Sequence, residues 1–437
     1  IGVREGLPKD SLRAVMEDRE GSLWAASEGV YRLQGGGVLK AYTAAEGLPN
    51  EAVWCIFRDR AGALLVGTDD GLVQARGKGW KLIPGTNNFQ VRSIVQGADG
   101  ALYLGGGPEV LRVDPRGGIR RFGMAEGIVT SGRIFRLLFD RKGDLWVATD
   151  GGGLLKGQGR GGQWRFQRQT VPGGTATERF KDLYEDASGR LWATGEKGLV
   201  MWDGAQWRRF TTQDGLRNDH VYYVRGGQSG ALVISYFDPY GLCRATYSQG
   251  VFRVLGHMDQ LFPQERLVYL YAEDGGGNLW VGTGQGLDRV ARDGRVEHFG
   301  RAEGLISEDT NAMAILPESN GDVWIGTSGG LARFDAGSYK GALKPPATVF
   351  LECRLGAQEY SSVPSTVSVR TPHGASTFTV KFSGLSYIRE GAVQYQVRLE
   401  GLEHDWHFSE TREERYPALP HGKYRFDARS RVGQGEW

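Results

Sequence analysis

The sequence contains a repeated pattern, and at one position of it three copies carry a side chain that could hold a polar ligand. Arg133, Arg179 and His220 each lie ten residues before a glycine that the pattern shares. Guanidinium and imidazole groups that converge on one point can donate hydrogen bonds to an anionic or polyhydroxylated ligand. The competing interpretation is that these residues form a solvated rim with no ligand role.

A second candidate is an aromatic turn in the sixth copy of the pattern. The segment Tyr236-Phe-Asp-Pro-Tyr240 replaces a Thr-x-x-Gly turn found in other copies. Aromatic faces beside one polar group are common in pockets for sugars and other amphipathic ligands. These rings could equally plug a channel or pack a longer loop. The candidate ligand contacts are therefore Arg133, Arg179, His220, Tyr236, Asp238 and Tyr240.

The sequence lacks the common motifs for catalysis, metal binding and nucleotide binding. The chain contains no GxxxxGK[ST], HExxH, EF-hand or GxSxG motif. A GxGxxG match at residues 157–162 falls between two expected strands rather than before a helix, so it does not predict a phosphate site. His404 and His407 stand three residues apart without a further ligand pattern. We therefore expect no catalytic residue, no bound metal and no cofactor.

The elements that must position the candidates are the short strands of one repeat. The phrase Asp-x-x-Gly-x-Leu-Trp recurs with variations every 38 to 47 residues. Its shared glycines are Gly21, Gly62, Gly100, Gly143, Gly189, Gly230, Gly277 and Gly321. A four-stranded propeller blade has a period of roughly 40–45 residues. The second copy predicts strands at residues 53–57, 64–68, 72–75 and 80–83, and the fold class is all-β.

Each repeated residue type has an expected structural role. The glycine supplies a positive φ for a tight hairpin, and the aspartate three residues earlier accepts hydrogen bonds from its own turn. A second phrase, exemplified by Glu46-Gly-Leu-Pro49, should connect an outer strand to the next inner strand on the ligand-binding face. Large rings are expected to fill the space between neighbouring blades. They belong to Trp24, Trp146, Trp192, Trp280 and Trp324.

Eight copies predict one β-propeller of eight blades over residues 1–344, with seven blades plus a stray repeat as the rival. A propeller removes its sheet edges by building the last blade from both ends of the ring. The eighth copy shows three strands and no clear fourth. Its outermost strand is therefore expected from the N-terminus, beginning upstream of Ile1. Pairing of residues 336–344 as that strand is the alternative.

Residues 345–437 form a second expected domain. Lys344-Pro-Pro346 ends the repeats, and at least five alternating strands follow, among them residues 377–382 and 393–399. Short alternating strands of this kind favour an immunoglobulin-like β-sandwich.

Composition excludes several classes of function. Of 437 residues 68 are glycine, and 53 Lys and Arg balance 51 Asp and Glu. This balance gives no electrostatic basis for binding nucleic acid or an anionic membrane. No run of 18 apolar residues could span a bilayer, and residues 1–8 lack a signal-peptide pattern. Three cysteines are too few for a disulfide framework.

The repeated phrases together carry a specific resemblance. Glu-Gly-Leu-Pro, then Asp-x-x-Gly-x-Leu-Trp, then an apolar run and Gly-Leu resembles the two-component regulator propeller repeat, over residues 5 to about 340. The copies around Gly100 and Gly230 depart most, because both lack the Asp and the Trp. The stretch beginning Tyr395-Gln-Val-Arg-Leu-Glu-Gly401 is similar to the Y_Y_Y domain, which follows such propellers in that family.

The resemblance implies a sensor region on the periplasmic or extracellular side of a bacterial hybrid histidine kinase or related signalling protein. Such a region is non-catalytic and binds a small-molecule ligand such as an oligosaccharide. It passes the signal through its C-terminal domain, where it forms a homodimer, to a kinase or cyclase output domain absent here. It reaches the membrane only through segments outside this chain.

Two other functions fit an all-β propeller. A secreted propeller glycosidase or lyase with Asp-box-like turns is one alternative, and a scaffold that binds only proteins is the other. A glycosidase would need clustered carboxylates around the channel. No carboxylate recurs at the position shared by Arg133, Arg179 and His220. Turnover of a glycan would support the enzyme, whereas saturable binding without turnover would support the sensor.

Overall fold

The computed structural model of the chain describes residues 12–18, 22–33, 38–77, 79–160, 163–227, 230–237, 241–258, 267–339, 345–361, 376–387, 393–432 and 437. The chain separates into two compact units, one formed by Gly37–Gly337 and the other by Ile1–Gly36 with Ser338–Trp437. The described elements of both are β-strands and short 3-10 turns. Among these elements there is no helix with the length and hydrophobicity needed to cross a membrane.

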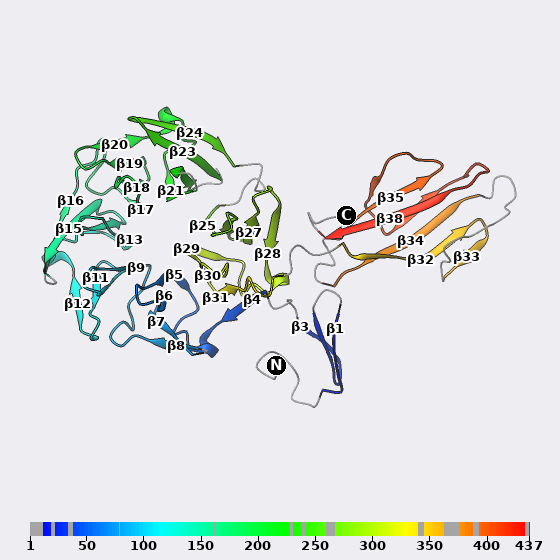
Figure 1. Cartoon of the computed structure of the whole chain (residues 1–437), viewed down its shortest axis with the longest axis horizontal. Helices are drawn as coiled ribbons and strands as arrows, with labels where there is room; N and C mark the ends of the chain where they lie inside the picture. Colours follow the sequence, from blue (N-terminus) through cyan, green and yellow to red (C-terminus); the bar gives the residue numbers. More distant parts are fainter. Residues whose placement is uncertain are drawn as a thin grey trace. The chain divides into compact units, whose positions relative to one another are not determined.

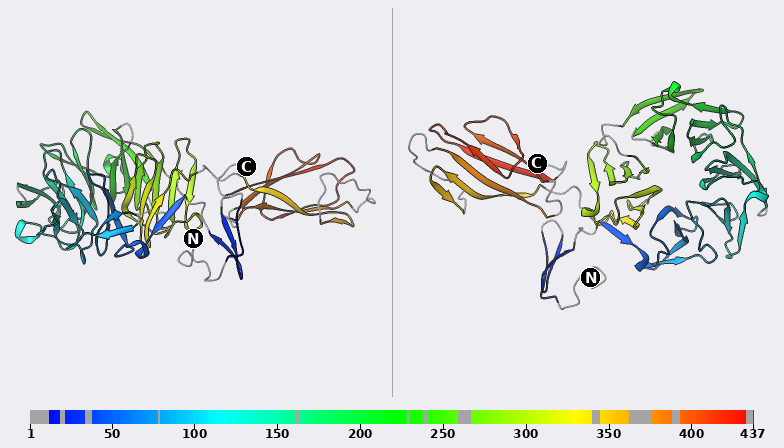
Figure 2. Two further views of the ribbon diagram at one scale, coloured as in Figure 1. Left: turned by 60° about the horizontal axis from the view of Figure 1, so that its bottom comes forward. Right: turned by 180° about the vertical axis from the view of Figure 1, so that it is seen from behind.

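Among the described residues of Gly37–Gly337, seven four-stranded antiparallel sheets surround a common axis (Figure 1). Figure 2 shows the same arrangement from behind. The first strands of neighbouring sheets contact one another, which places them at the axis. Each sheet is therefore one blade of a propeller, with its later strands farther out.

Six blades use four consecutive strands. The first blade comprises β5 (Val53–Arg58), β6 (Leu64–Thr68), β7 (Gly71–Arg76) and β8 (Gly79–Leu82). The second comprises β9 (Ser93–Gln96), β10 (Leu102–Gly105), β11 (Val110–Val113) and β12 (Ile119–Phe122). The third comprises β13 (Ile134–Phe139), β14 (Leu145–Thr149), β15 (Leu154–Arg160) and β16 (Gln163–Arg168).

The next three blades repeat this order. The fourth comprises β17 (Phe180–Glu185), β18 (Leu191–Gly195), β19 (Gly198–Trp202) and β20 (Trp207–Phe210). The fifth comprises β21 (Val221–Gly226), β22 (Leu232–Tyr236), β23 (Leu242–Ser248) and β24 (Val251–His257). The sixth comprises β25 (Leu270–Glu273), β26 (Leu279–Thr283), β27 (Gly286–Val290) and β28 (Val296–Phe299).

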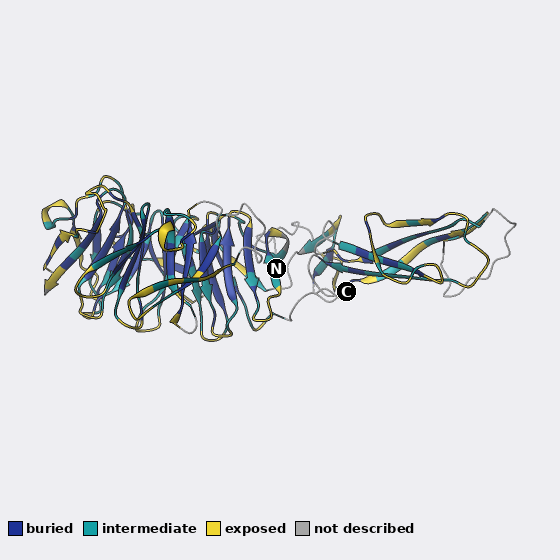
Figure 3. Ribbon diagram, turned by 90° about the horizontal axis from the view of Figure 1, so that it is seen from above, coloured by how far each residue is buried: buried dark blue, intermediate teal, exposed yellow. Residues whose placement is uncertain are grey.

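Burial is strongest in the second strand of each blade. β6 reads Leu-Leu-Val-Gly-Thr and β26 reads Leu-Trp-Val-Gly-Thr, and every residue of both strands is buried. Figure 3 shows this burial along the blade strands. Continuous runs of branched and aromatic residues are expected where a strand is covered on both faces. The apolar core therefore lies between the blades, and the channel at the axis is lined by the first strands.

The seventh blade is closed by a strand from the N-terminal end of the unit. It combines β29 (Thr310–Pro317), β30 (Val323–Thr327) and β31 (Gly330–Phe334) with β4 (Leu39–Tyr42). β4 runs antiparallel to β31, with Leu39 opposite Phe334 and Tyr42 opposite Leu331. This pairing removes the sheet edge that β31 would otherwise expose.

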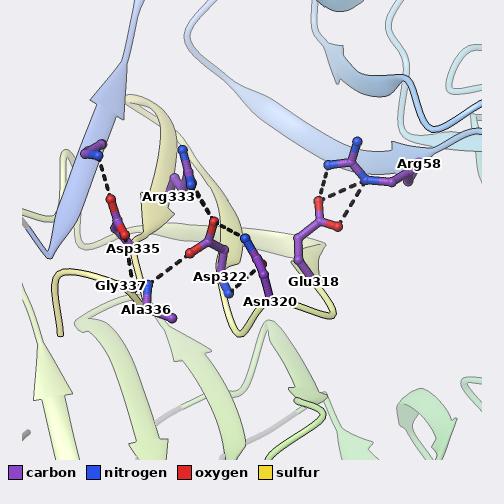
Figure 4. Close-up of polar contacts among 9 residues, drawn as sticks. Arg58, Glu318, Asn320, Asp322, Arg333, Asp335, Ala336 and Gly337 are labelled. Carbon is purple, nitrogen blue, oxygen red and sulfur yellow. Dashed lines mark hydrogen bonds and ion pairs between the residues drawn. The ribbon is translucent and has the colours of Figure 1, made fainter.

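Polar contacts reinforce the closure (Figure 4). Lys40 on β4 forms an ion pair of 2.5 Å with Asp335. Arg58 on β5, in the first blade, places Nε 3.0 Å from both carboxylate oxygens of Glu318, which follows β29. Asp322 accepts a hydrogen bond of 2.9 Å from the Ala336 N–H, which holds the chain where it leaves the seventh blade.

The expectation of eight blades is therefore corrected. β1 (Ala14–Glu17), β2 (Leu23–Ala26) and β3 (Val30–Leu33) of the first repeat form a separate three-stranded sheet, which belongs to the other unit. Closure by an N-terminal strand is confirmed, but that strand is β4, rather than residues upstream of Ile1 or residues 336–344. The fourth strand of a repeat need not pair with its third, because the open edge of the last blade competes for it. The ring unit accordingly spans residues 37–337 instead of 1–344.

The repeated turn has the expected conformation and one contact that the sequence did not predict. The described glycines at the repeat position have positive φ, between 76° and 90°. Asp140 Oδ1 accepts a hydrogen bond of 3.0 Å from the Asp144 N–H, and its Oδ2 accepts one of 2.8 Å from Trp146 Nε1. The same indole–carboxylate bond recurs, at 2.7, 2.9 and 2.9 Å, in the pairs Trp24–Asp18, Trp192–Asp186 and Trp280–Asp274.

The repeat tryptophans of the ring fill the space between blades, as predicted. The Trp192 ring lies 5.8 Å from Tyr247 in the next blade, and the Trp280 ring lies 4.8 Å from Phe334. Both indoles are fully buried. Aromatic contacts at these separations add to the stabilisation that burial of the rings provides.

The Glu-Gly-Leu-Pro phrase connects an outer strand to the next inner strand, as predicted. In its first described copy the 3-10 turn η2 (Ala44–Glu46) joins β4 to β5. Glu46 Oε2 accepts a hydrogen bond of 2.7 Å from the Thr43 N–H, and Gly47 ends the turn with a φ of 98°. Leu48 is buried and anchors the connection. Equivalent turns are η3 (Met124–Glu126), η4 (Thr212–Asp214) and η7 (Arg301–Glu303).

The described C-terminal strands form two antiparallel sheets. One contains β33 (Gln358–Tyr360), β32 (Ala347–Leu355), β34 (Phe378–Leu385) and β37 (Glu413–Tyr416). The other contains β36 (His407–Ser409), β35 (Val393–Glu400) and β38 (Arg425–Val432). Phe382 of the first sheet packs with Tyr395 and Val397 of the second in one buried cluster. The two sheets therefore enclose a common core.

Candidate ligand-binding site

One face of the propeller carries both the connections between blades and the turns between second and third strands, which lie at the same end of an antiparallel sheet. Contacts join these two kinds of segment. Arg179, just before β17, places Nε 3.0 Å from Asp150 Oδ1 in the β14–β15 turn. The His220 ring, just before β21, stacks on Phe237, just after β22, at 4.4 Å. We call this the ligand face.

The predicted contacts do not all come together on the ligand face. Arg133 and Arg179 are exposed there and His220 is half-buried. Tyr236 is only 1% exposed, and its hydroxyl lies 3.2 Å from Cys243 Sγ and accepts a hydrogen bond of 3.2 Å from the Arg217 N–H. Its ring packs in the core between the fourth and fifth blades. We therefore remove Tyr236 from the candidate site.

The rest of the aromatic turn is only partly described. Asp238 and Tyr240 lie outside the described residues, and their proposed role stays a prediction. Phe237 takes the place that the sequence analysis assigned to Tyr236, since it is 38% exposed and contacts His220 and Tyr222. The aromatic turn thus contributes to the ligand face through a neighbouring residue.

A more central set of residues was missed. Phe135, Lys181 and Tyr222 stand two positions after Arg133, Arg179 and His220, and each lies at a register shift between the first two strands of its blade. The corresponding residues of the seven blades are Trp54, Arg92, Phe135, Lys181, Tyr222, Tyr269 and Met313. We call this set the channel ring. Comparing the repeats at this position would have shown four aromatic residues, two cations and no carboxylate.

Arg92 and Trp54 form a closely packed pair within the channel ring. The guanidinium carbon of Arg92 lies 3.6 Å from the centroid of the Trp54 ring. Arg92 Nε donates a hydrogen bond of 2.8 Å to Gln90 Oε1, and Trp54 Nε1 donates one of 2.7 Å to Asp69 Oδ1. Gln90 Nε2 also donates to Asp69. Burial lowers the pKa of Arg92, and the nearby Arg133 lowers it further.

Lys181 and Phe135 form a second cation–aromatic pair. Lys181 Nζ lies 3.6 Å from the centroid of the Phe135 ring. Burial lowers the pKa of the Lys181 ammonium to about 8; Asp150 opposes this shift, and three nearby arginines reinforce it. A cation held against an aromatic face keeps an attractive partner even where it is partly removed from water. Lys181 is therefore still mainly charged at neutral pH.

A buried ionic group lies beside the channel ring. Asp182 is fully buried, and its carboxylate is shared between Arg225, which donates to Oδ2, and Arg136, whose Nε lies 3.6 Å from Oδ1. The Val224 N–H donates a further hydrogen bond of 3.1 Å to Asp182. Burial lowers the pKa of Arg136 to about 10, and repulsion from Arg225 adds to the lowering. Two guanidiniums and one carboxylate leave a net positive charge at this depth.

A cavity of about 30 Å³ opens between these groups. Its walls are formed by Trp54, Arg92, Phe135, Arg136, Lys181, Tyr223, Ala312 and Met313. Three of these side chains are cations and none is acidic. A volume of roughly 10–15 Å³ on this measure admits one water molecule, so the cavity holds a small group rather than a whole ligand.

Two of the carboxylates described on the ligand face are held by other side chains. Asp69 and Asp150 lie on the ligand face, and each is already bound, to Trp54 and Arg179 respectively. Within the described part of the chain no three His, Cys, Asp or Glu side chains are grouped so that they could hold a metal ion. Cys55 is buried, which raises the pKa of its thiol to about 12 and disfavours a thiolate nucleophile.

Comparisons with known proteins give a short family match and several structures of similar fold. The model of a family described as two component regulator propeller matches residues 47–70, which confirms the predicted repeat. No curated protein matches the chain in sequence. The chain is similar to the extracellular domain of the hybrid two-component system BT3049 from B. thetaiotaomicron, with a TM-score of 0.75 and 16% identity over 99% of this chain and 60% of that one.

Two further structures share the fold. The extracellular domain of the hybrid two-component system BT4673 from B. thetaiotaomicron gives a TM-score of 0.57 and 15% identity, over 97% of this chain and 61% of that one. Virginiamycin B lyase from Staphylococcus aureus gives a TM-score of 0.53 and 12% identity, over 68% of this chain and 98% of that one. The chain thus spans about three fifths of the two-component structures. At these identities the likeness concerns the fold alone, and it agrees with the all-β propeller expected from the repeats.

Proposed function

We propose that this chain is the ligand-sensing region of a bacterial membrane signal-transduction protein, on the periplasmic or extracellular side. It binds a small molecule at the channel ring without chemical turnover. The likeness to extracellular domains of two-component systems and the regulator repeat at residues 47–70 support the signalling role. The observation that carries the binding role is that six of the seven channel-ring residues are aromatic or cationic.

The composition of the channel ring fits an oligosaccharide. Aromatic faces pack against the apolar faces of sugar rings, while a few polar groups fix the orientation of the ligand. Trp54 and Phe135 supply such faces beside Arg92 and Lys181. Arg133, Arg179 and His220 surround them on the ligand face, where hydroxyl groups of a longer ligand would find donors.

Isothermal titration of the whole chain with a panel of neutral and acidic oligosaccharides tests this proposal, with mass spectrometry of each mixture to detect products. The expected result is saturable binding without product. Trp54→Ala should weaken binding at least about tenfold, because it removes a central aromatic contact. Trp207→Ala, on the outer strand β20, is the matched control and should leave affinity unchanged.

A propeller lyase or glycosidase is the second candidate, which the likeness to virginiamycin B lyase favours. The same experiment distinguishes the two functions. A product released from any member of the panel would support the enzyme and overturn the sensor. If Trp54→Ala leaves the affinity as high as Trp207→Ala does, the channel ring is not the binding site.

We also infer that the two C-terminal sheets form an immunoglobulin-like sandwich that passes the signal on through a homodimer. Leu351 and Leu385 are 51% and 49% exposed, and such residues offer apolar surface to a second copy. Sedimentation of the chain should show a dimer, and Leu351→Glu with Leu385→Glu should shift it to a monomer. A monomeric parent chain would contradict this inference without affecting ligand binding.

A further inference from the structure

We propose that the ligand of the channel ring is an acidic saccharide, whose carboxylate or sulfate group enters the cationic cavity while its sugar ring stays at the aromatic mouth. This inference rests on the proposed function and adds the chemical class of the ligand. It is carried by the charge of the cavity, its volume and the partners of its cations.

The charge of the cavity is one-sided. Arg92, Arg136 and Lys181 line it, and no acidic residue does. Asp182 lies beside Arg136, but its carboxylate is divided between Arg136 and Arg225, so it offsets only one of the two guanidiniums. Like charges gathered in a space of low dielectric repel one another, and an anion placed among them relieves that repulsion.

The partners of two of these cations leave room for an anion. Arg92 lies over Trp54 and Lys181 lies over Phe135, so in both cases an aromatic face covers one side of the cation. The carboxylate that attracts Lys181, that of Asp150, is 3.0 Å from Arg179 and thus already paired. A partly buried cation is costly unless a counter-charge completes its surroundings. The oxyanion of a ligand would supply that counter-charge.

The volume of the cavity decides which part of the ligand enters it. About 30 Å³ suits a group such as a carboxylate or sulfate, whereas a sugar ring is too large. The ring must therefore remain outside the cavity, and the ligand face offers it Phe237, which is 38% exposed and stacks on His220. Tyr222, whose ring centroid is 5.4 Å from that of Phe237, extends the same aromatic surface.

Calorimetric titration of the whole chain with three probes tests the proposal. The probes are α-1,4-trigalacturonate, the same trisaccharide with its carboxyl groups methyl-esterified, and a chondroitin 4-sulfate disaccharide. At least one acidic probe should bind about tenfold or more tightly than the ester, and its affinity should fall as salt is raised. Comparison of the two acidic probes decides whether the cavity takes a carboxylate or a sulfate.

Variants of the cavity residues test whether the preference for the acidic probe arises at the cavity. Lys181→Met and Arg92→Met should each remove most of the preference for the acidic probe, with thermal unfolding used to confirm that the variants remain folded. Arg116→Met is the matched control, because Arg116 is exposed in the β11–β12 turn of the same blade as Arg92 but at the opposite end of the sheet. It should leave the preference unchanged.

Every outcome bears on the proposal. Binding of the ester as tight as that of both acidic probes, or a preference that survives both Lys181→Met and Arg92→Met, would overturn the acidic ligand class while leaving a sensor for neutral saccharides intact. Failure of both acidic probes to bind would also overturn it. Release of product from any probe would instead contradict the proposed sensor function, so the two failures are distinguishable.

Discussion

The indole of Trp192 and the carboxylate of Asp186 are joined by a hydrogen bond of 2.9 Å from Nε1 to Oδ2. The other carboxylate oxygen of Asp186 accepts a hydrogen bond of 3.1 Å from the Arg190 N–H. One side chain therefore holds both the hairpin turn and the ring that fills the space to the next blade. In the second repeat Leu65 replaces the tryptophan, and Asp59 keeps only its backbone bond, to Ala63.

Replacing Asp186 should cost more stability than replacing Asp59. Asp186→Ala leaves a buried indole N–H and turn N–H groups without their acceptor, for a loss of about 2–3 kcal/mol in the free energy of unfolding. Asp59→Ala removes only a turn contact, for a loss of about 1 kcal/mol. Urea denaturation of the two variants measures the difference. Equal losses would show that the indole bond contributes nothing.

Acid should weaken the fold through the same aspartates. Burial raises the pKa of Asp186, but hydrogen bonds from Trp192 and Arg190 outweigh it and the net pKa is lowered; Asp274 shows the same balance. Such a carboxyl binds protons more readily in the unfolded chain. Its stabilisation is therefore complete above the ordinary pKa of 3.8 and is lost as the pH falls through the folded value. The urea midpoint of unfolding should fall as the pH is lowered from above 3.8 through the folded pKa. Asp186→Asn should make that midpoint depend less on pH.

Gly47→Ala should be more damaging than Gly62→Ala. Both glycines have positive φ, at 98° and 84°, so each substitution strains the backbone by about 1 kcal/mol. A Cβ at position 47 would also lie 2.6 Å from the carbonyl oxygen of Trp80, whereas position 62 has open space. Thermal unfolding should show the larger loss for Gly47→Ala. Equal melting temperatures would mean that the connection shifts freely.

Closure of the ring can be measured through Arg58 and Glu318. A double-mutant cycle with Arg58→Gln and Glu318→Gln should give a coupling of about 1 kcal/mol, because the pair is bidentate and partly shielded from water. The exposed pair Arg295 and Asp293, 3.4 Å apart within one turn, is the control and should couple by nearly zero. No coupling between Arg58 and Glu318 would argue against contact between the first and last blades.

Binding of an acidic ligand should weaken as the pH rises through the pKa of Lys181. Burial lowers that pKa to about 8, so the ammonium is charged at pH 7 and largely neutral well above pH 8. Titrations of the tighter acidic probe across this range should show the decline. Lys181→Arg keeps its charge throughout and should show a flat profile. The same decline in the variant would assign the titration to another group.

Local features of the fold followed from the sequence, because residues close in the chain decide them. The positive φ of Gly62 and the hydrogen bond that Asp59 accepts from the Ala63 N–H in the same turn depend on backbone geometry within a few residues. The period of the repeat then implied blades, since each short strand must cover its apolar faces with neighbours. The regulator-repeat resemblance rested on the same local phrases.

The site was only half predictable for a different reason. Alignment of the repeats placed Arg179 and His220 on the ligand face, but the register shift of β17 at Lys181 and the packing around it decide that Lys181 lines the cavity. Tyr236 and Phe237 are adjacent aromatic residues. Only packing decides that the first is buried in the core and the second is exposed.

The sequence alone thus determined the turns, the strands and their repetition, all of which arise from contacts within one repeat. Only the tertiary structure decided how many blades close and which strand closes them. β4 pairs with β31, although nearly the whole sequence of the ring separates the two strands. No local pattern distinguishes β31 from β3 as the partner of β4. The exposed edge of the seventh blade makes the distant pairing favourable, because its unpaired N–H and C=O groups gain partners that no nearby strand supplies.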